Sequence, residues 1–99
     1  MPSYSVYLVE CGDGTLYTGI ATNVERRIEE HAGTARGARY LRGRGPIRIV
    51  FQQVIGDRGL ASRIEARVKK LPRADKADAE SLPARIRAWL EEFESLSTG

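Results

Sequence analysis

The stretch of sequence that decides the fold runs from residue 3 to residue 31 and reads SYSVYLVECGDGTLYTGIATNVERRIEEH. Its first eight residues are rich in β-branched and aromatic side chains, which favour a strand over residues 3–10. The glycines and the Asp-Gly pair of residues 11–14 accept the backbone angles of a hairpin turn. A second strand is therefore expected over residues 15–20, although the turn leaves its register open by one residue.

A short amphipathic helix is expected to follow the hairpin and to end at about residue 32. Thr22 and Glu25 have the spacing of a capping box, in which each side chain accepts a hydrogen bond from the other residue's backbone N–H. Gly33 is a natural stop for the helix. A helix of this length can lie flush against the hairpin and cover one face of it.

This local structure brings four side chains with useful chemistry close together. Arg27 and His31 stand four residues apart, so they share one strip of the helix surface. Tyr7 and Tyr17 come from the two strands of the hairpin. With Glu65, a helical glutamate beside an apolar stripe later in the chain, this set suits phosphodiester cleavage better than any other common chemistry.

The rest of the chain predicts one more strand and further helices. Residues 47–55 are apolar on both faces, which predicts a strand that is covered on both sides. A helix over residues 60–71 ends at a proline, a weak helical turn is expected over residues 74–80, and a last helix over residues 82–94. The order β-β-α-β-α-α predicts an α+β fold, a small three-stranded antiparallel sheet packed with helices.

Length and composition are those of one small domain. Ninety-nine residues, 41% of them apolar and 29% charged, support one core and no second lobe, so residues 1–99 are expected to form a single domain. No apolar run approaches the ~20 residues of a membrane span, and the N-terminus lacks the layout of a signal peptide. One cysteine excludes an internal disulfide and a cysteine-rich zinc site. A cytoplasmic protein with no membrane partner is expected.

The charge is distributed unevenly along the chain, although the net charge is only +3. Residues 32–76 hold twelve lysines and arginines against three acids, and residues 77–99 hold two against five. A basic middle suits a polyanionic partner such as nucleic acid. Codon usage could explain many arginines but not their clustering. The basic loop, residues 33–46, contains the candidate nucleic-acid-binding residues Arg36, Arg39, Tyr40, Arg42 and Arg44.

Five positions form an ordered set of motifs along the chain, namely Ser5-Val6-Tyr7, Tyr17-Thr18-Gly19, Arg27, His31 and Glu65. Over residues 3–76 the set resembles the GIY-YIG nuclease domain, and within it the small, stand-alone bacterial proteins of that family. Three departures accompany the resemblance. Ser5-Val6 stands where the name-giving pattern has glycine and isoleucine, Ile20 replaces a lysine of some members, and the late asparagine of many members is absent.

The resemblance implies a divalent-metal-dependent nuclease, endo- or exonucleolytic, that cuts DNA with little sequence specificity in DNA repair or recombination. It assigns catalytic roles to Tyr7, Tyr17, Arg27, His31 and Glu65. Within that set, Arg27 clamps the phosphate and Glu65 binds the metal. A single carboxylate suits Mg²⁺ or Mn²⁺, because such hard ions keep several waters and take a substrate phosphate as a ligand.

Several alternatives stay open at this point. Tyr17 is the favoured base, assisted by Arg27 and the metal, while Tyr7 orients the water or shares that role. The substrate can be duplex, single-stranded or branched DNA, and RNA is not excluded. The rival classes are a nucleic-acid-binding protein without activity and a subunit that a protein partner targets. A strand tyrosine is often simply a core residue, and a helical arginine is often simply solvated.

Overall fold

A computed structural model describes residues 2–33 and 47–98 of the chain. In this part, three strands form one antiparallel sheet in the order β2-β1-β3, with β1 (Tyr4–Cys11), β2 (Leu16–Ala21) and β3 (Ile47–Gly56). The helices of the described residues are α1 (Val24–Gly33), α2 (Arg58–Lys69), α3 (Arg73–Ala77) and α4 (Leu82–Thr98). The predicted α+β architecture is confirmed. The weak helical turn expected over residues 74–80 is the short helix α3, which adds one helix to the expected order.

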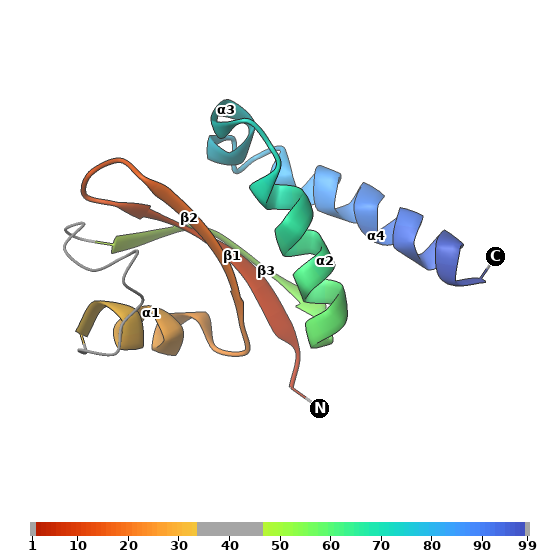
Figure 1. Cartoon of the computed structure of the whole chain (residues 1–99), viewed down its shortest axis with the longest axis horizontal. Coiled ribbons are helices and arrows are strands. Elements are labelled where there is room, and N and C mark those ends of the chain that lie inside the picture. The colour runs from red at the N-terminus through yellow and green to blue at the C-terminus, as the bar shows by residue number, and fades with distance from the viewer. Residues whose placement is uncertain (1, 34–46, 99) are drawn as a thin grey trace.

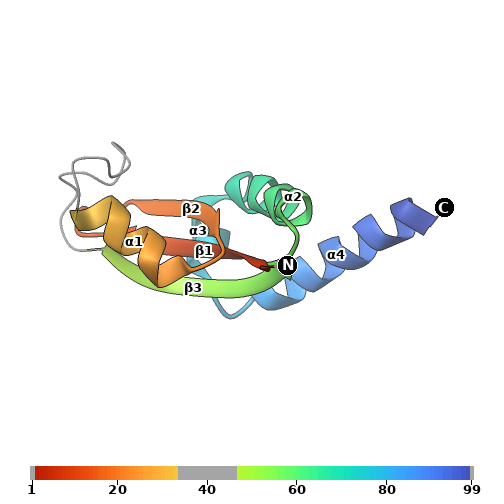
Figure 2. The ribbon, with the colours of Figure 1, turned by 90° about the horizontal axis from the view of Figure 1, so that it is seen from below.

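The helices cover the two faces of the sheet unequally, as Figures 1 and 2 show. Helix α1 lies against one face, and α2 and α4 lie against the other. The end of α4 extends beyond the sheet, away from α1. Within the described residues, no helix combines the length and the apolar character that crossing a bilayer requires.

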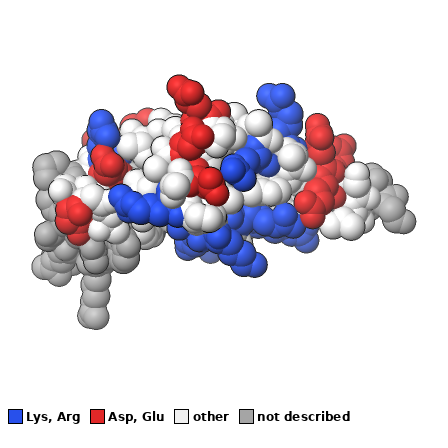
Figure 3. All heavy atoms as spheres, turned by 90° about the horizontal axis from the view of Figure 1, so that it is seen from above, with Lys and Arg blue, Asp and Glu red and all other residues white. Residues whose placement is uncertain are grey.

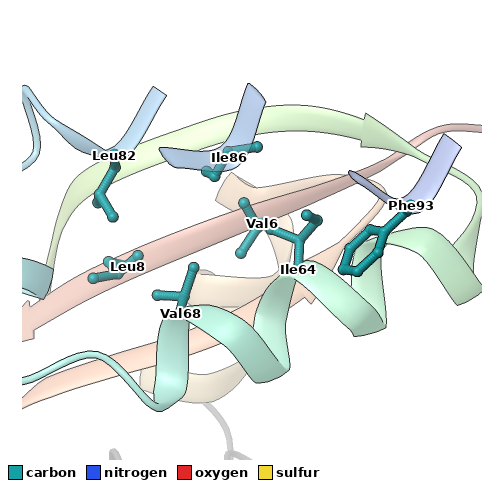
Figure 4. Close-up of a cluster of buried hydrophobic side chains, with 7 residues drawn as sticks. All are labelled: Val6, Leu8, Ile64, Val68, Leu82, Ile86 and Phe93. Carbon is teal, nitrogen blue, oxygen red and sulfur yellow. The ribbon is translucent and has the colours of Figure 1, made fainter. Parts of the chain in front are cut away.

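The larger core lies between the sheet and the pair α2 and α4. In Figure 4, two side chains of β1 point toward α2, and side chains of α4 close the cluster from the other side. Its buried members are Val6, Leu8, Ile64, Val68, Leu82, Ile86 and Phe93. Each fully buried side chain of this kind stabilises the fold by roughly 1.5–3 kcal/mol. This cluster fixes α2 against the central strand, which matters because α2 contains Glu65.

The smaller core lies between the sheet and α1, with Tyr7, Val9, Cys11, Ala21 and Val24 as its buried members. The hairpin register, which the turn left open, pairs Tyr7 with Gly19 and Val9 with Tyr17. The turn itself uses Gly14 at φ 83, and Asp13 Oδ1 accepts a hydrogen bond from the backbone N–H of Thr15 at 3.0 Å. Because successive residues of a strand alternate between its faces, the two tyrosines lie on the same side of the sheet.

The start of α1 differs from the expected capping box. Asn23, not Thr22, caps the helix, since its Oδ1 accepts a hydrogen bond from the backbone N–H of Arg26 at 3.0 Å. Asparagine is among the best N-cap residues. The Glu25 carboxylate instead accepts a hydrogen bond from Gln52 Nε2 on β3 at 3.3 Å. With Asn23 as the cap, Glu25 in the first turn of α1 is bonded to Gln52 and so links α1 to the edge strand β3.

Strand β3 lies at an edge of the sheet, and it packs against both cores, with Ile47 and Ile49 against the smaller one and Val50, Phe51 and Ile55 against the larger one. The expected cover of both faces is therefore present but partial. None of its residues is fully buried, and Val54 is 67% exposed. The pairing with β1 shifts by one residue between Leu8 and Val9, which is the pattern of a β-bulge. The bulge turns two consecutive side chains, Val50 and Phe51, toward the same core.

The last helix, α4, runs to Thr98, four residues beyond its expected end at residue 94. No glycine or proline interrupts residues 95–98, so nothing in the sequence stops the helix at the expected place.

Candidate active site

An open pocket of about 540 Å³ lies where β2, the first turns of α1 and one side of α2 meet. Residues from four elements line it, and they include four of the five side chains that sequence analysis assigned to catalysis: Tyr7, Tyr17, Arg27 and Glu65. The hairpin supplies the tyrosines, α1 supplies the arginine, and α2 supplies the glutamate from the other face of the sheet. The structure therefore brings these four residues together, while their roles stay predictions.

The other site residues of the sequence analysis are His31 and five residues of the basic loop. His31 belongs to the last turn of α1, and its assignment as a catalytic residue stays a prediction. The five residues assigned to nucleic-acid binding, Arg36, Arg39, Tyr40, Arg42 and Arg44, lie outside the described residues.

Tyr7 is held in place by packing on every side. It is 1% exposed and its ring lies over Gly19 of the neighbouring strand. A Cβ atom at Gly19 would stand 2.5 Å from the Tyr7 hydroxyl oxygen, so only glycine allows this close approach. The ring of Tyr17 lies beside it, with ring centroids 6.5 Å apart and planes tilted by 41°. The glycine of the second motif thus sets the position of the tyrosine of the first.

The hydroxyl of Tyr7 is strongly biased toward its protonated form. Burial, and then the neighbouring Tyr17, raise the pKa of Tyr7 from 10.0 to about 12. Arg27 partly offsets this rise in pKa, because its guanidinium lies close by and donates a hydrogen bond to the Tyr7 oxygen. The structure therefore pairs Arg27 with Tyr7, whereas sequence analysis expected the guanidinium to assist Tyr17.

The raised pKa of Tyr7 predicts a loss of stability at alkaline pH. Below about pH 10 the folded and unfolded chains both keep the Tyr7 proton, but between about pH 10 and pH 12 the unfolded chain releases it first. The free energy of unfolding is then expected to fall by about 3 kcal/mol through this group. Urea unfolding of the wild type and of Tyr7→Phe at both ends of this pH range measures the effect. The variant should lose less stability than the wild type, and equal losses would contradict the assignment.

Arg27 presents a half-exposed guanidinium to the pocket. Its side chain is 51% exposed, and its Nη1 stands 3.8 Å from Glu30 Oε2. The same glutamate pairs with Arg26 at 3.3 Å. Exposed pairs of this kind contribute only ~0.2–1 kcal/mol, so an incoming phosphate can replace Glu30 as the partner of Arg27 at little cost.

Glu65 reaches the pocket from α2. The buried neighbours Ile64 and Val68 fix the helix against the sheet, and Asp57 caps it through a 2.8 Å hydrogen bond to the backbone N–H of Leu60. The Glu65 side chain is 22% exposed, and its Oε2 stands 3.7 Å from Lys69 Nζ. It also lies close enough to Tyr7 to contribute to the raised pKa of that hydroxyl. Glu65 is thus a partly sheltered carboxylate at the rim of the pocket.

The donor set of this pocket fits a divalent ion that is held through one carboxylate. Nowhere in the described residues do three or more His, Cys, Asp or Glu side chains gather as a metal cage. Mg²⁺ and Mn²⁺ do not require such a cage, because water and substrate phosphate supply their other oxygen ligands. Glu65 would hold the ion, and the openness of the pocket leaves room for those ligands.

Sequence analysis missed two cations of the pocket, Arg26 beside Arg27 on α1, and Arg58 on α2. Arg58, the first residue of α2, lines the same pocket as Glu65. The two residues stand seven apart, which is two helical turns and therefore one face of the helix. That spacing was the available signal.

Comparison with known proteins agrees with this geometry. The family model described as the GIY-YIG catalytic domain matches residues 3–78. The chain belongs to the GIY-YIG family, and the family points to the nuclease superfamily and to DNA as the class of substrate.

Within that family the chain is similar to proteins named UPF0213. UPF0213 protein YhbQ of Escherichia coli K12 is 43% identical over 98 residues, which are 99% of this chain and 94% of that protein. UPF0213 protein DP2720 of Desulfotalea psychrophila is 51% identical over 70 residues, 71% of this chain and 64% of that protein, so the match spans less than two thirds of that relative. The solution NMR structure of UPF0213 protein BH0048 from Bacillus halodurans is 45% identical, covers 81% of this chain and 84% of that one, and has a TM-score of 0.50. These names state no activity.

Proposed function

We propose that this chain is a divalent-metal-dependent nuclease that hydrolyses phosphodiester bonds of DNA with little sequence specificity. The observation that supports it most is the convergence of Tyr7, Tyr17, Arg27 and Glu65 on one open pocket. Two phenols, a guanidinium and a single carboxylate supply the groups that in-line displacement at a phosphate needs. A place in DNA repair or recombination belongs to the same proposal, since a nuclease of low sequence specificity can act on the shape of DNA.

Arg27 and Tyr7 act as one unit in the proposed mechanism. The Arg27 guanidinium has a planar fork that can span two phosphate oxygens, and it also donates a hydrogen bond to the Tyr7 oxygen. Because the pKa of Tyr7 is about 12, its hydroxyl keeps its proton at neutral pH. Tyr7 therefore donates a hydrogen bond to a substrate oxygen or to the attacking water, rather than accepting a proton.

Tyr17 is the proposed general base. It lies beside Tyr7 in the same pocket and is half-buried, whereas Tyr7 is almost fully buried. It therefore has better access to a water molecule in the pocket. Glu65 would hold the divalent ion, which, when bound, supplies positive charge that stabilises the phosphate in the transition state.

A cleavage assay with labelled DNA tests the proposal. Duplex, single-stranded and branched substrates are each incubated with the protein, with and without Mg²⁺ or Mn²⁺, and the products are separated by length. Cleavage of at least one substrate is expected only when the ion is present, and a chelator should stop it. A protein that binds these substrates and cuts none of them would be a nucleic-acid-binding protein without nuclease activity.

Replacing Arg27 with lysine is expected to slow cleavage by ~10²–10³-fold, because the variant keeps the charge but loses the fork that stabilises the transition state. Single-turnover rates with the enzyme in excess over DNA measure this step. Arg87→Lys is the matched control, since Arg87 is exposed on α4 and does not line the pocket. A tenfold effect or less at Arg27 would assign it a structural role only.

A further inference from the structure

The outer face of α2 is strongly basic, and neither the proposed catalytic set nor the basic loop accounts for it. Between residues 58 and 70 this face holds five cations, namely Arg58, Arg63, Arg67, Lys69 and Lys70. The single acid of that segment is Glu65, the proposed metal ligand. In Figure 3, lysine and arginine side chains gather along one side of the molecule, over α2. We call these five residues the α2 basic face.

One side of the α2 basic face is part of the active-site pocket. Arg58 lines that pocket together with Arg27 and Glu65. Lys69 is placed on the same side of the helix, since it contacts Glu65 one turn earlier at 3.7 Å. A backbone that leaves the pocket therefore meets Arg58 and Lys69 first.

The other side lines a groove of about 480 Å³ between α2 and α4. Its walls are Arg63, Ala66, Arg67, Lys70, Phe93 and Leu96. Arg67 links α2 to α4, because it forms an ion pair with Glu92 at 3.0 Å and lies 5.1 Å from the centre of the Phe93 ring. Arg63 also contacts that ring, at 5.6 Å. Neither Arg63 nor Lys70 forms an ion pair with any residue that the structure describes.

We infer that the α2 basic face is a phosphate-binding track, which holds the nucleic-acid backbone that flanks the cleaved bond. Helical periodicity puts Arg58 on the pocket side of α2 and Arg63 and Lys70 on the groove side. Arg63 also lines a neighbouring pocket with Asp57 and Glu94, whose carboxylates oppose an anionic partner on that side. The track therefore crosses the exposed surface of α2 from the pocket to the groove beside α4.

The inference rests on the proposed nuclease function and adds a surface to it. Cations that are not neutralised by acids lower the free energy of a bound phosphate backbone and release its counterions. Such contacts position the substrate without reading its sequence. An acidic protein segment is the other ligand that this charge would attract, and the experiment separates the two.

The test is the salt dependence of binding to a labelled DNA duplex of mixed sequence, measured by fluorescence anisotropy without divalent metal. Arg63→Gln and Lys70→Gln are each expected to flatten the slope of log affinity against log salt by about 0.9, and the double variant by about twice that. Arg63→Lys should keep the wild-type slope, because it keeps the charge. Arg87→Gln is the control for charge loss elsewhere, and thermal melting shows whether each variant is folded.

Each outcome decides between the two proposals. Slopes that fall as expected in a protein that cuts nothing with Mg²⁺ would support the track and contradict the nuclease function. If the double variant keeps the wild-type slope and still cleaves DNA, the track is overturned and the nuclease function stands. The same holds if binding of a poly-glutamate peptide depends on Arg63 and Lys70 but binding of DNA does not. A wild type that binds no nucleic acid would overturn both.

Discussion

Replacing Glu65 with glutamine is expected to reduce metal-dependent cleavage by about 10³-fold or more while DNA binding persists. Glutamine keeps the size of the side chain and its hydrogen bonding, but it removes the charge that a hard divalent ion requires. Such an ion contributes several kcal/mol to the stability of the transition state, and each ~1.4 kcal/mol is a factor of ten in rate. Single-turnover cleavage over a range of Mg²⁺ concentrations measures the loss.

The fold should tolerate this change. The ion pair with Lys69 joins residues one turn apart, and a pair of this kind contributes only ~0.3–0.5 kcal/mol. Glu91→Gln, an exposed carboxylate on α4 that is not in the pocket, is the control for the loss of one negative charge. A Glu65→Gln variant that cuts as fast as the parent would show that Glu65 is not the metal ligand.

Replacing Tyr17 with phenylalanine is expected to have the next largest effect, a loss of ~10²–10⁴-fold in the rate of the chemical step, as for other general bases. Tyr7→Phe should leave a reduced but measurable rate, lower by about tenfold, because it removes one hydrogen bond. The contrast follows from burial. The pKa of Tyr7 is about 12, so its hydroxyl is a donor at neutral pH, whereas Tyr17 is more accessible to water.

Single-turnover rates of both variants test the roles of the two tyrosines directly. Neither hydroxyl is needed for the apolar packing of the rings, so both variants should unfold cooperatively and remain folded at the assay temperature. If Tyr7→Phe loses all activity and Tyr17→Phe is only slow, the two roles are reversed. The nuclease proposal would survive that result, because it depends on the pocket as a whole.

The first half of the site could be predicted from sequence because its signals are local. An Asp-Gly turn between two strands with alternating side chains predicts a hairpin, and a capped amphipathic segment predicts the helix after it. The placement of Glu65 beside Ile64, at the rim of an apolar stripe, likewise follows from helical periodicity alone. These patterns do not require knowledge of which elements pack together.

The contacts that sequence analysis missed depend on register and on distant neighbours. The pairing of Tyr7 with Gly19 depends on a register that the turn leaves open by one residue. Glu25 forms no capping box, because a partner on β3, Gln52, is available to it in the folded chain. Strand β3 is as apolar as a central strand, yet it lies at an edge of the sheet, so its composition alone does not predict the strand order.

The close contact between Tyr7 and Gly19 also links the evolution of two positions that stand twelve residues apart. As long as residue 7 is a tyrosine packed across the neighbouring strand, residue 19 has no room for a side chain. An alanine there could persist only in a lineage that had already reduced the ring at position 7, and with it the proton donor. The two positions are therefore expected to be inherited as a pair, so that a relative with a side chain at position 19 should also lack the tyrosine at position 7.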